Sequence, residues 1–191
     1  MTCTMLNNVS IRLMSGGHAF SNSDIETLKG AGKCAVVEIV THKTMLRPEQ
    51  GFIKADAKHD LETAGYAIAE DEVVVSTPAV EGKVAIMAVN AKCVDAITAL
   101  GIEVAYTSPL LTCGDISEGS HLAIYDNVLY VLVYKEGLRF AEALAVESDA
   151  DILFYLESIN RVYGIYNMYA RAIGDTKRLK RVCRKYFKNR F

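Results

Sequence analysis

The sequence lacks the features that mark a membrane-spanning or exported protein. No apolar run among its 191 residues reaches the roughly 18 that a transmembrane helix needs. The first residues, MTCTMLNN, have neither the basic region nor the apolar region of a signal peptide. We therefore expect a cytoplasmic protein without a transmembrane segment.

Paired metal ligands and paired cysteines are also missing. The five cysteines are odd in number and widely spaced, and none belongs to a CxxC pair. That pattern argues against both a disulfide framework and a thiolate zinc site. The four histidines never fall three or four residues apart, so no histidine pair has ligand spacing on a helix. We predict reduced, buried thiols and no metal site.

The signature motifs of common enzymes are absent as well. There is no GxSxG, no HExxH and no paired-carboxylate motif. The run GAGK at 30–33 resembles the end of a phosphate-binding loop, but Cys34 stands where Ser or Thr is needed and a strand pattern follows. We interpret this run as a plain turn. The sequence therefore predicts no catalytic residue and favours a protein that is not an enzyme.

The composition is that of a folded domain, with 51% hydrophobic and 23% charged residues. Its charge is unevenly distributed, because the last 15 residues contain eight cations and no acid. The cations are Lys177, Arg178, Lys180, Arg181, Arg184, Lys185, Lys188 and Arg190. The first 176 residues hold the other 13 basic residues and all 23 acidic ones, a formal charge of −10. An acidic body thus precedes a basic tail.

The most clearly patterned stretch is 121–147, which is rich in apolar, β-branched and aromatic residues. Two short polar breaks divide it, at Asp126-Asn127 and at Lys135-Glu136-Gly137. This spacing predicts three strands in an antiparallel meander, with Asp126-Asn127 as a type I′ turn. The pattern then predicts a helix at 150–163 capped by Ser148-Asp149, a strand at 165–173 and a helix at 177–190.

The first half has a similar predicted order. Its elements are strands at 9–14 and within 18–24, a strand at 34–42, a loop at 43–57, a helix at 58–71, a strand at 72–78 and a β-α-β segment at 84–107. A Gly- and Ser-rich stretch at 108–120 separates the halves. We predict an N-terminal unit at 1–113 and a C-terminal unit at 114–191, related by an ancient duplication.

Two copies of β-β-β-α-β resemble the ground plan of the actin-like, or RNase H-like, ATPase superfold. Residues 84–111 look like the strand-helix-Gly-strand segment of the pilus assembly protein PilM and its relatives. Together with VSIRLM near the start and GDTKRLKRV near the end, nearly the whole chain resembles an uncharacterised Bacteroidetes family of unknown function with that fold. The resemblance implies an α/β protein with a duplicated RNase H-like (actin-like ATPase) fold and mixed sheets.

In the ATPases of this superfold, hairpins carrying aspartate and glycine hold Mg²⁺ and the phosphates. The matching positions here are incomplete: Gly16 and Gly17 have no aspartate, Asp126 and Asn127 have no glycine, and Gly174 stands alone near the adenine position. These five residues would contact a nucleotide if one binds. We predict that no cofactor is used and that ATP is not hydrolysed.

The basic terminal helix is the other candidate site. Its apolar stripe should pack on the sheet and leave exposed the anion- or partner-binding candidates Arg178, Arg181, Arg184, Lys185 and Lys188. Such a face could bind RNA, DNA or an acidic lipid surface. It could also dock on the acidic body or contact a second protomer. Because the body is acidic, we favour docking or oligomer contact over nucleic acid.

Three functional hypotheses follow. The first is a non-catalytic actin-like protein, a pseudo-ATPase, that binds a protein partner or assembles as a homo-oligomer. The second is a nucleotide-binding ATPase with degenerate motifs. The third is a module that binds RNA or a membrane surface through residues 177–190.

Overall fold

The protein separates into two compact units, residues 1–111 and 112–191. The structure, a computed structural model, describes residues 9–14, 34–112 and 118–187. Gly16, Gly17, Lys188 and the strand predicted within 18–24 lie outside these ranges. Within the described part, no helix is long and apolar enough to cross a membrane.

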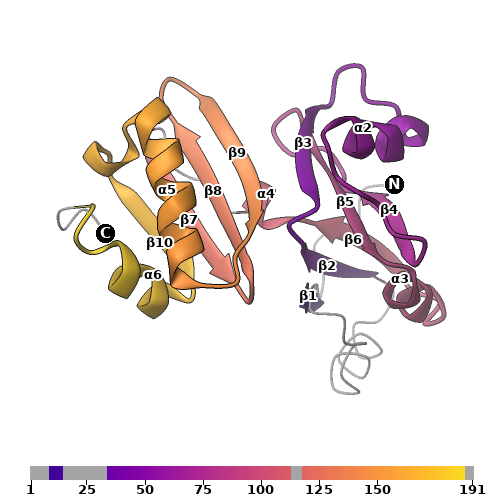
Figure 1. The fold of residues 1–191 in the computed structure, drawn as a ribbon. Coiled ribbons are helices and arrows are strands. Elements are labelled where there is room, and N and C mark those ends of the chain that lie inside the picture. Colours follow the sequence, from indigo (N-terminus) through magenta and orange to yellow (C-terminus); the bar gives the residue numbers. More distant parts are fainter. Residues whose placement is uncertain (1–8, 15–33, 113–117, 188–191) are drawn as a thin grey trace. The chain divides into compact units, whose positions relative to one another are not determined.

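The first unit contains two three-stranded sheets (Figure 1). Its elements are β1 (Val9–Met14), β2 (Cys34–Val40), β3 (Thr44–Pro48), η1 (Lys54–Asp56), α2 (Ala57–Thr63), β4 (Glu72–Ser76), β5 (Lys83–Asn90), α3 (Ala91–Thr98), β6 (Glu103–Thr107) and the short α4 (Pro109–Thr112). One sheet is parallel, in the order β1-β2-β6, and the other is antiparallel, in the order β3-β5-β4. In the parallel sheet, the neighbour of β2 is therefore β6, which is far from it in sequence.

Strand β5 is the centre of the first unit because it is buried on both faces. Its side chains alternate between two apolar clusters, as successive residues of a strand must. Ile86 faces α2 and packs with Leu61, whereas Met87 packs in the cluster that contains Ile39 and Ile97 of α3. A near-continuous apolar run in the sequence thus marks a strand with two covered faces.

Three predictions for the first unit are wrong. The loop predicted at 43–57 contains β3, which exists because it pairs with β5, Thr44 lying opposite Met87. The helix predicted at 58–71 starts at Ala57 and ends at Thr63, since Gly65 turns the chain with a φ of +93°. The elements of the predicted β-α-β segment form, but β5 and β6 belong to different sheets.

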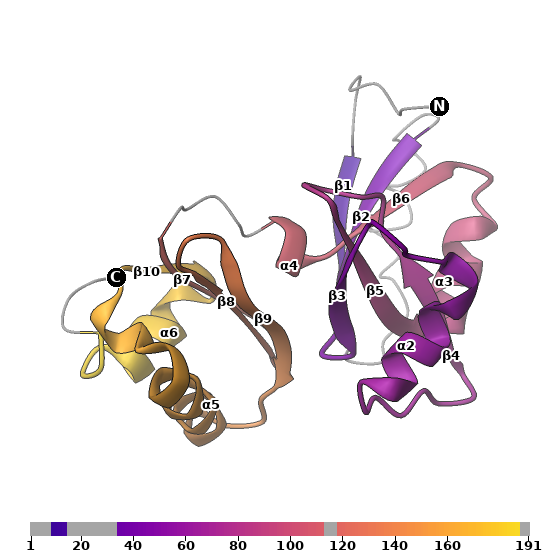
Figure 2. The ribbon, with the colours of Figure 1, turned by 90° about the horizontal axis from the view of Figure 1, so that it is seen from above.

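The second unit is a four-stranded sheet in the order β10-β7-β8-β9, with α5 and α6 packed against it (Figure 2). Its elements are β7 (Gly119–Tyr125), β8 (Val128–Tyr134), β9 (Leu138–Ala145), α5 (Asp149–Tyr163), η2 (Ile165–Asn167), β10 (Ala170–Gly174) and α6 (Thr176–Cys183). Strands β7, β8 and β9 pair antiparallel, and β10 pairs parallel with β7. The predicted meander and its β-β-β-α-β order are confirmed.

Local signals fix most of this order. Ser148 and Asp151 form a reciprocal capping box at the start of α5, and Gly164 ends that helix with a φ of +68°. Asp175 caps α6 by accepting a hydrogen bond from the Arg178 N–H. Asp126 has a φ of +52°, but a type I′ turn needs positive φ at both central residues, and Asn127 does not have it.

Two predicted elements of the second unit are longer than those observed. The strand predicted at 165–173 begins with the 3₁₀ turn η2, because Gly164 redirects the chain and Ile165 is buried in the core. The helix predicted at 177–190 ends at Cys183. Beyond it, Tyr186 and Phe187 pack against Tyr166, with ring centroids 5.1 and 5.0 Å apart. The apolar residues at the end of the predicted stripe thus anchor a turn.

Candidate functional site at the carboxyl ends of β7 and β10

The second unit gathers several predicted site residues at one edge of its sheet. Because β7 and β10 are parallel, their carboxyl ends meet there, with Gly174 opposite Ile124. The β7–β8 turn that holds Asp126 and Asn127 follows at the same edge. The Val146 N–H donates to the Asn127 carbonyl oxygen over 2.8 Å, which brings in the end of β9. Three of the predicted nucleotide-contact residues are therefore neighbours.

Gly174 has a packing role at this edge. Its φ of +73° is the left-handed conformation that suits glycine. A Cβ at this position would collide with the Ile124 carbonyl oxygen and would approach the Tyr125 ring to 2.8 Å. The following Asp175 N–H donates to that same carbonyl oxygen at 3.0 Å. The close approach of the two strand ends thus explains this glycine without a ligand.

Two of the predicted anion-binding arginines are engaged inside the molecule. Arg178 Nε and Arg181 donate to opposite oxygens of Asp149, each over 2.8 Å. The hydrogen bond from Arg178 is the largest of the effects that lower the pKa of Asp149; partial burial opposes it and Arg181 adds to it. The basic helix is therefore held against the start of α5 by one carboxylate.

The rest of the basic helix divides into a buried side and an exposed side. Leu179 and Cys183 are buried in the core, while Arg184 and Lys185 are exposed. Burial, followed by the charge of Asp149, raises the pKa of Cys183 to about 12. A thiol with that pKa is protonated and unreactive at neutral pH. Among the described residues, Arg184 and Lys185 are the predicted anion-binding cations that are exposed and form no ion pair.

The carboxylates at this edge serve mainly as caps and counter-ions. Asp151 accepts hydrogen bonds from the Glu147 and Ser148 N–H groups, and these bonds lower its pKa. Asp175 caps α6, and Asp149 binds two arginines. In the described ranges, no group of three histidine, cysteine or acidic residues could hold a metal ion. The contacts that these carboxylates make are ion pairs and helix caps.

A second candidate site lies on the outer face of α5. Phe154 and Val162 are 67% and 73% exposed, whereas the other large apolar residues of this helix are buried or half-buried. Neither residue belongs to the apolar stripe that the sequence predicts for α5. Large apolar residues that lie off the buried stripe are the sequence signal that could have identified this face.

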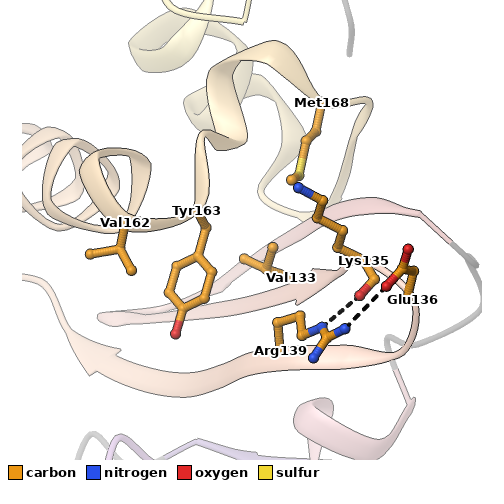
Figure 3. Close-up of a pocket in the computed structure, with 7 residues that line it drawn as sticks. All are labelled: Val133, Lys135, Glu136, Arg139, Val162, Tyr163 and Met168. Carbon is orange, nitrogen blue, oxygen red and sulfur yellow. Dashed lines mark hydrogen bonds and ion pairs between the residues drawn. The ribbon is translucent and has the colours of Figure 1, made fainter.

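Val162 also lines a pocket of about 310 Å³ between the end of α5 and the β8–β9 hairpin (Figure 3). Its lining residues are Val133, Lys135, Glu136, Arg139, Val162, Tyr163 and Met168. Arg139 is held at the rim by the Lys135 carbonyl oxygen at 2.6 Å and by Glu136 at 3.5 Å. The pocket thus combines apolar walls from α5 and β8 with a charged rim from the hairpin.

Comparison with solved structures assigns the fold. A Bacteroides thetaiotaomicron protein described as having an actin-like ATPase fold and unknown function superposes with a TM-score of 0.62 at 12% identity, over 81% of this chain and 66% of that one. The chain thus spans slightly less than two thirds of that protein's length. The protein has the predicted α/β class and an actin-like ATPase fold.

A second solved structure is similar over 86% of this chain and 81% of its own length, with a TM-score of 0.47 and 15% identity. It is the cytoplasmic domain of EpsL, an inner-membrane component of the type II secretion system of Vibrio cholerae. No known protein family matches the sequence, and no curated protein matches it.

Proposed function

We propose that this protein is a non-catalytic member of the actin-like fold class that works by binding another protein molecule, either a different protein or a second copy of itself. The observation that carries the proposal is the pairing of Asp149 with Arg178 and Arg181 at the carboxyl ends of β7 and β10. If a nucleotide bound as the resemblance to actin-like ATPases implies, its contacts would include residues of this edge. Here Arg178 and Arg181, two of the cations that could bind phosphate, are already paired with a carboxylate.

Electrostatics at this edge also disfavours a nucleotide. Asp126 follows β7 on an exposed two-residue turn, and Asp175 caps the helix that follows β10. Phosphate groups bind where backbone N–H groups and cations converge, and carboxylates repel them unless a cation such as Mg²⁺ lies between the two. The contact that an added Cβ at Gly174 would make with Ile124 and Tyr125 gives this glycine a packing role that needs no phosphate or adenine.

The outer face of α5 supports protein binding. Phe154 and Val162 expose large apolar surfaces at separate points of one helix face, next to the pocket of the β8–β9 hairpin. Exposed apolar side chains beside a charged rim are typical of protein-binding surfaces. Burial in an interface would remove their contact with water.

The test for the non-catalytic part is a thermal-shift titration with Mg-ATP. At about 5 mM ligand, a site with a Kd of about 1 mM would stabilise the folded state by about 1 kcal/mol, or about 3 °C. We expect no shift and no phosphate release above the blank. A reproducible shift, or turnover, would overturn the proposal and favour a degenerate ATPase.

The matched variant is Asp149→Asn, which removes the counter-charge of Arg178 and Arg181, keeps one side-chain oxygen as an acceptor and replaces the other with an NH₂ group. If this carboxylate is what neutralises the edge, the variant should be stabilised more than the wild type by the same concentration of triphosphate. If triphosphate stabilises the two proteins equally, the carboxylate of Asp149 is not what keeps phosphate from binding to Arg178 and Arg181.

Anion binding through the basic residues that follow α6 is a second candidate, and the exposure of Arg184 and Lys185 favours it. Affinity for RNA or for vesicles containing anionic lipid should then fall steeply with salt. It should also be lost in the double variant Arg184→Ala with Lys185→Ala. Binding that ignores salt, or that survives both substitutions, would exclude this surface.

A further inference from the structure

The two large exposed apolar residues of α5 are placed symmetrically about Ser158. Phe154 and Val162 lie four residues before and four residues after Ser158, a small exposed residue. Residues at this spacing share one face of a helix, and the two apolar side chains are about 12 Å apart along the axis. A second α5 running antiparallel and centred on Ser158 would bring Phe154 of each copy level with Val162 of the other.

The charges on this face are self-complementary in the same arrangement. Glu157 and Arg161 are both exposed, and neither forms an ion pair within the described ranges, although their i,i+4 spacing allows one. In the antiparallel pair, Glu157 of one copy falls within about 3 Å, along the axis, of Arg161 of the other, on the same side of the interface. The two-fold pair therefore contains the Glu157–Arg161 contact twice.

The pocket beside Val162 provides room for the aromatic ring. Figure 3 shows Val162 and Tyr163 of α5 on one side and the β8–β9 hairpin residues on the other. If the two helices cross so that the row 154–158–162 of one lies along the same row of the other, as in packing of i±4 ridges, Phe154 of a second copy would lie beside Val162 at the mouth of this apolar pocket. A two-fold axis would produce the contact twice, which is the self-complementary interface that closed dimers use.

We propose that the outer face of α5 is a self-association surface, on which Phe154 of one copy packs against Val162 and its pocket in a second copy in a two-fold antiparallel pair. The inference rests on the proposed protein-binding function and names the partner as this same chain. One helix face is smaller than the standard interface of about 1,600 Å². We therefore expect a reversible dimer with a dissociation constant in the micromolar range.

The experiment is sedimentation velocity of the full chain from about 5 to about 500 µM, which brackets a micromolar dissociation constant. The wild type should shift from monomer to dimer across this range. Phe154→Ser should weaken the dimer at least about tenfold, as expected when a central aromatic residue is truncated. Tyr169→Ser is the matched control, because Tyr169 is 56% exposed in the same unit but lies outside α5. Circular dichroism confirms that each variant is folded.

Charge exchange tests the antiparallel geometry. Glu157→Arg and Arg161→Glu should each weaken the dimer, because each places like charges opposite one another. An equimolar mixture of these two variants should dimerise again, since every facing pair in the heterodimer is then of opposite sign. Glu147→Arg carries the same charge change off this face and should dimerise like the wild type.

A wild type that stays monomeric throughout, a dimer that ignores Phe154→Ser, or a mixture no better than its two components would each overturn the self-association surface. These results leave the proposed function standing, because α5 could still bind a different protein. A thermal shift with Mg-ATP would overturn the proposed function whatever the state of the dimer.

Discussion

The two units use opposite ways of building a sheet. In the second unit, β7, β8 and β9 are consecutive in the chain and adjacent in the sheet. In the first unit, β2 lies beside β6, and β3, β4 and β5 come between them in sequence and form a sheet of their own. Turn residues in the sequence predict the meander of the second unit. No local pattern predicts the pairing of β2 with β6 in the first unit, because these strands meet only when distant segments pack.

The units also differ in how they hold their charged pairs. In the first unit, Lys43 and Glu72 are about four-fifths buried and lie 2.6 Å apart, and Glu72 also accepts a hydrogen bond from the Ala69 N–H. In the second unit, the side chains of Asp149 and of its partner Arg181 are 43% and 70% exposed. Loss of a buried charged partner leaves groups unsatisfied, whereas water replaces an exposed one. The same kind of ion pair should therefore contribute differently to the two units.

The largest effect is expected where the strand ends of the second unit meet. Gly174→Ala should destabilise the protein by about 3 kcal/mol, because a strained φ and a collision with the Ile124 backbone act together. Gly164→Ala is the matched control, with a φ of +68° but open space around the added Cβ, and should cost about 1–2 kcal/mol. Urea unfolding followed by circular dichroism measures both. Equal losses would mean that the contact with Ile124 contributes nothing.

An intermediate effect is expected for the buried pair of the first unit. Burial by itself would raise the pKa of Glu72, but the hydrogen bonds from Lys43 and the Ala69 N–H outweigh burial and lower it. Glu72→Gln should therefore cost about 1–2 kcal/mol in the same urea experiment. If it costs no more than the neutralisation of Asp149, the difference in burial between the two pairs does not control their contribution.

The smallest effect is expected for Asp149→Asn, which should cost less than about 1 kcal/mol at neutral pH because the pair is exposed. The pKa of Asp149 lies below its ordinary value of 3.8 in the folded protein, so its stabilising contribution is present above that value and is lost as the pH falls through the folded pKa. The stability difference between variant and wild type should be constant from about pH 5 upward and vanish in stronger acid. A difference that grows on acidification would contradict this assignment.

Local chemistry made the second unit predictable. The polar pair Asp126-Asn127 and the Lys135-Glu136-Gly137 turn gave the meander, and Ser148 and Gly164 gave both ends of α5. Predictions failed where a tertiary contact replaces a local preference. β3 has a weak pattern and forms because β5 supplies hydrogen-bond partners, and the apolar residues around Ile165 form a 3₁₀ turn on the core.

The candidate sites divide in the same way. The sequence placed Asp126, Asn127 and Gly174 at one functional edge only through a family resemblance, and the parallel pairing of β7 with β10 is what brings them together. Asp149 was predicted as a cap, and its role as counter-ion of Arg178 and Arg181 needs the packing of α5 beside α6. Phe154 and Val162 were not singled out, although both lie off the predicted apolar stripe; the packing of α5 on the sheet is what shows that they face solvent.

Sequence alone therefore determined the strands and helices whose caps and turns are encoded in adjacent residues, the uneven charge, and the missing catalytic motifs. Tertiary structure decided which strands pair, which of the terminal cations are neutralised, and which face of α5 stays exposed. The physical reason is the distance in sequence between the residues that interact. Hydrogen bonds of caps and hairpins join residues a few positions apart, whereas burial and ion pairing depend on segments that meet only in the folded chain.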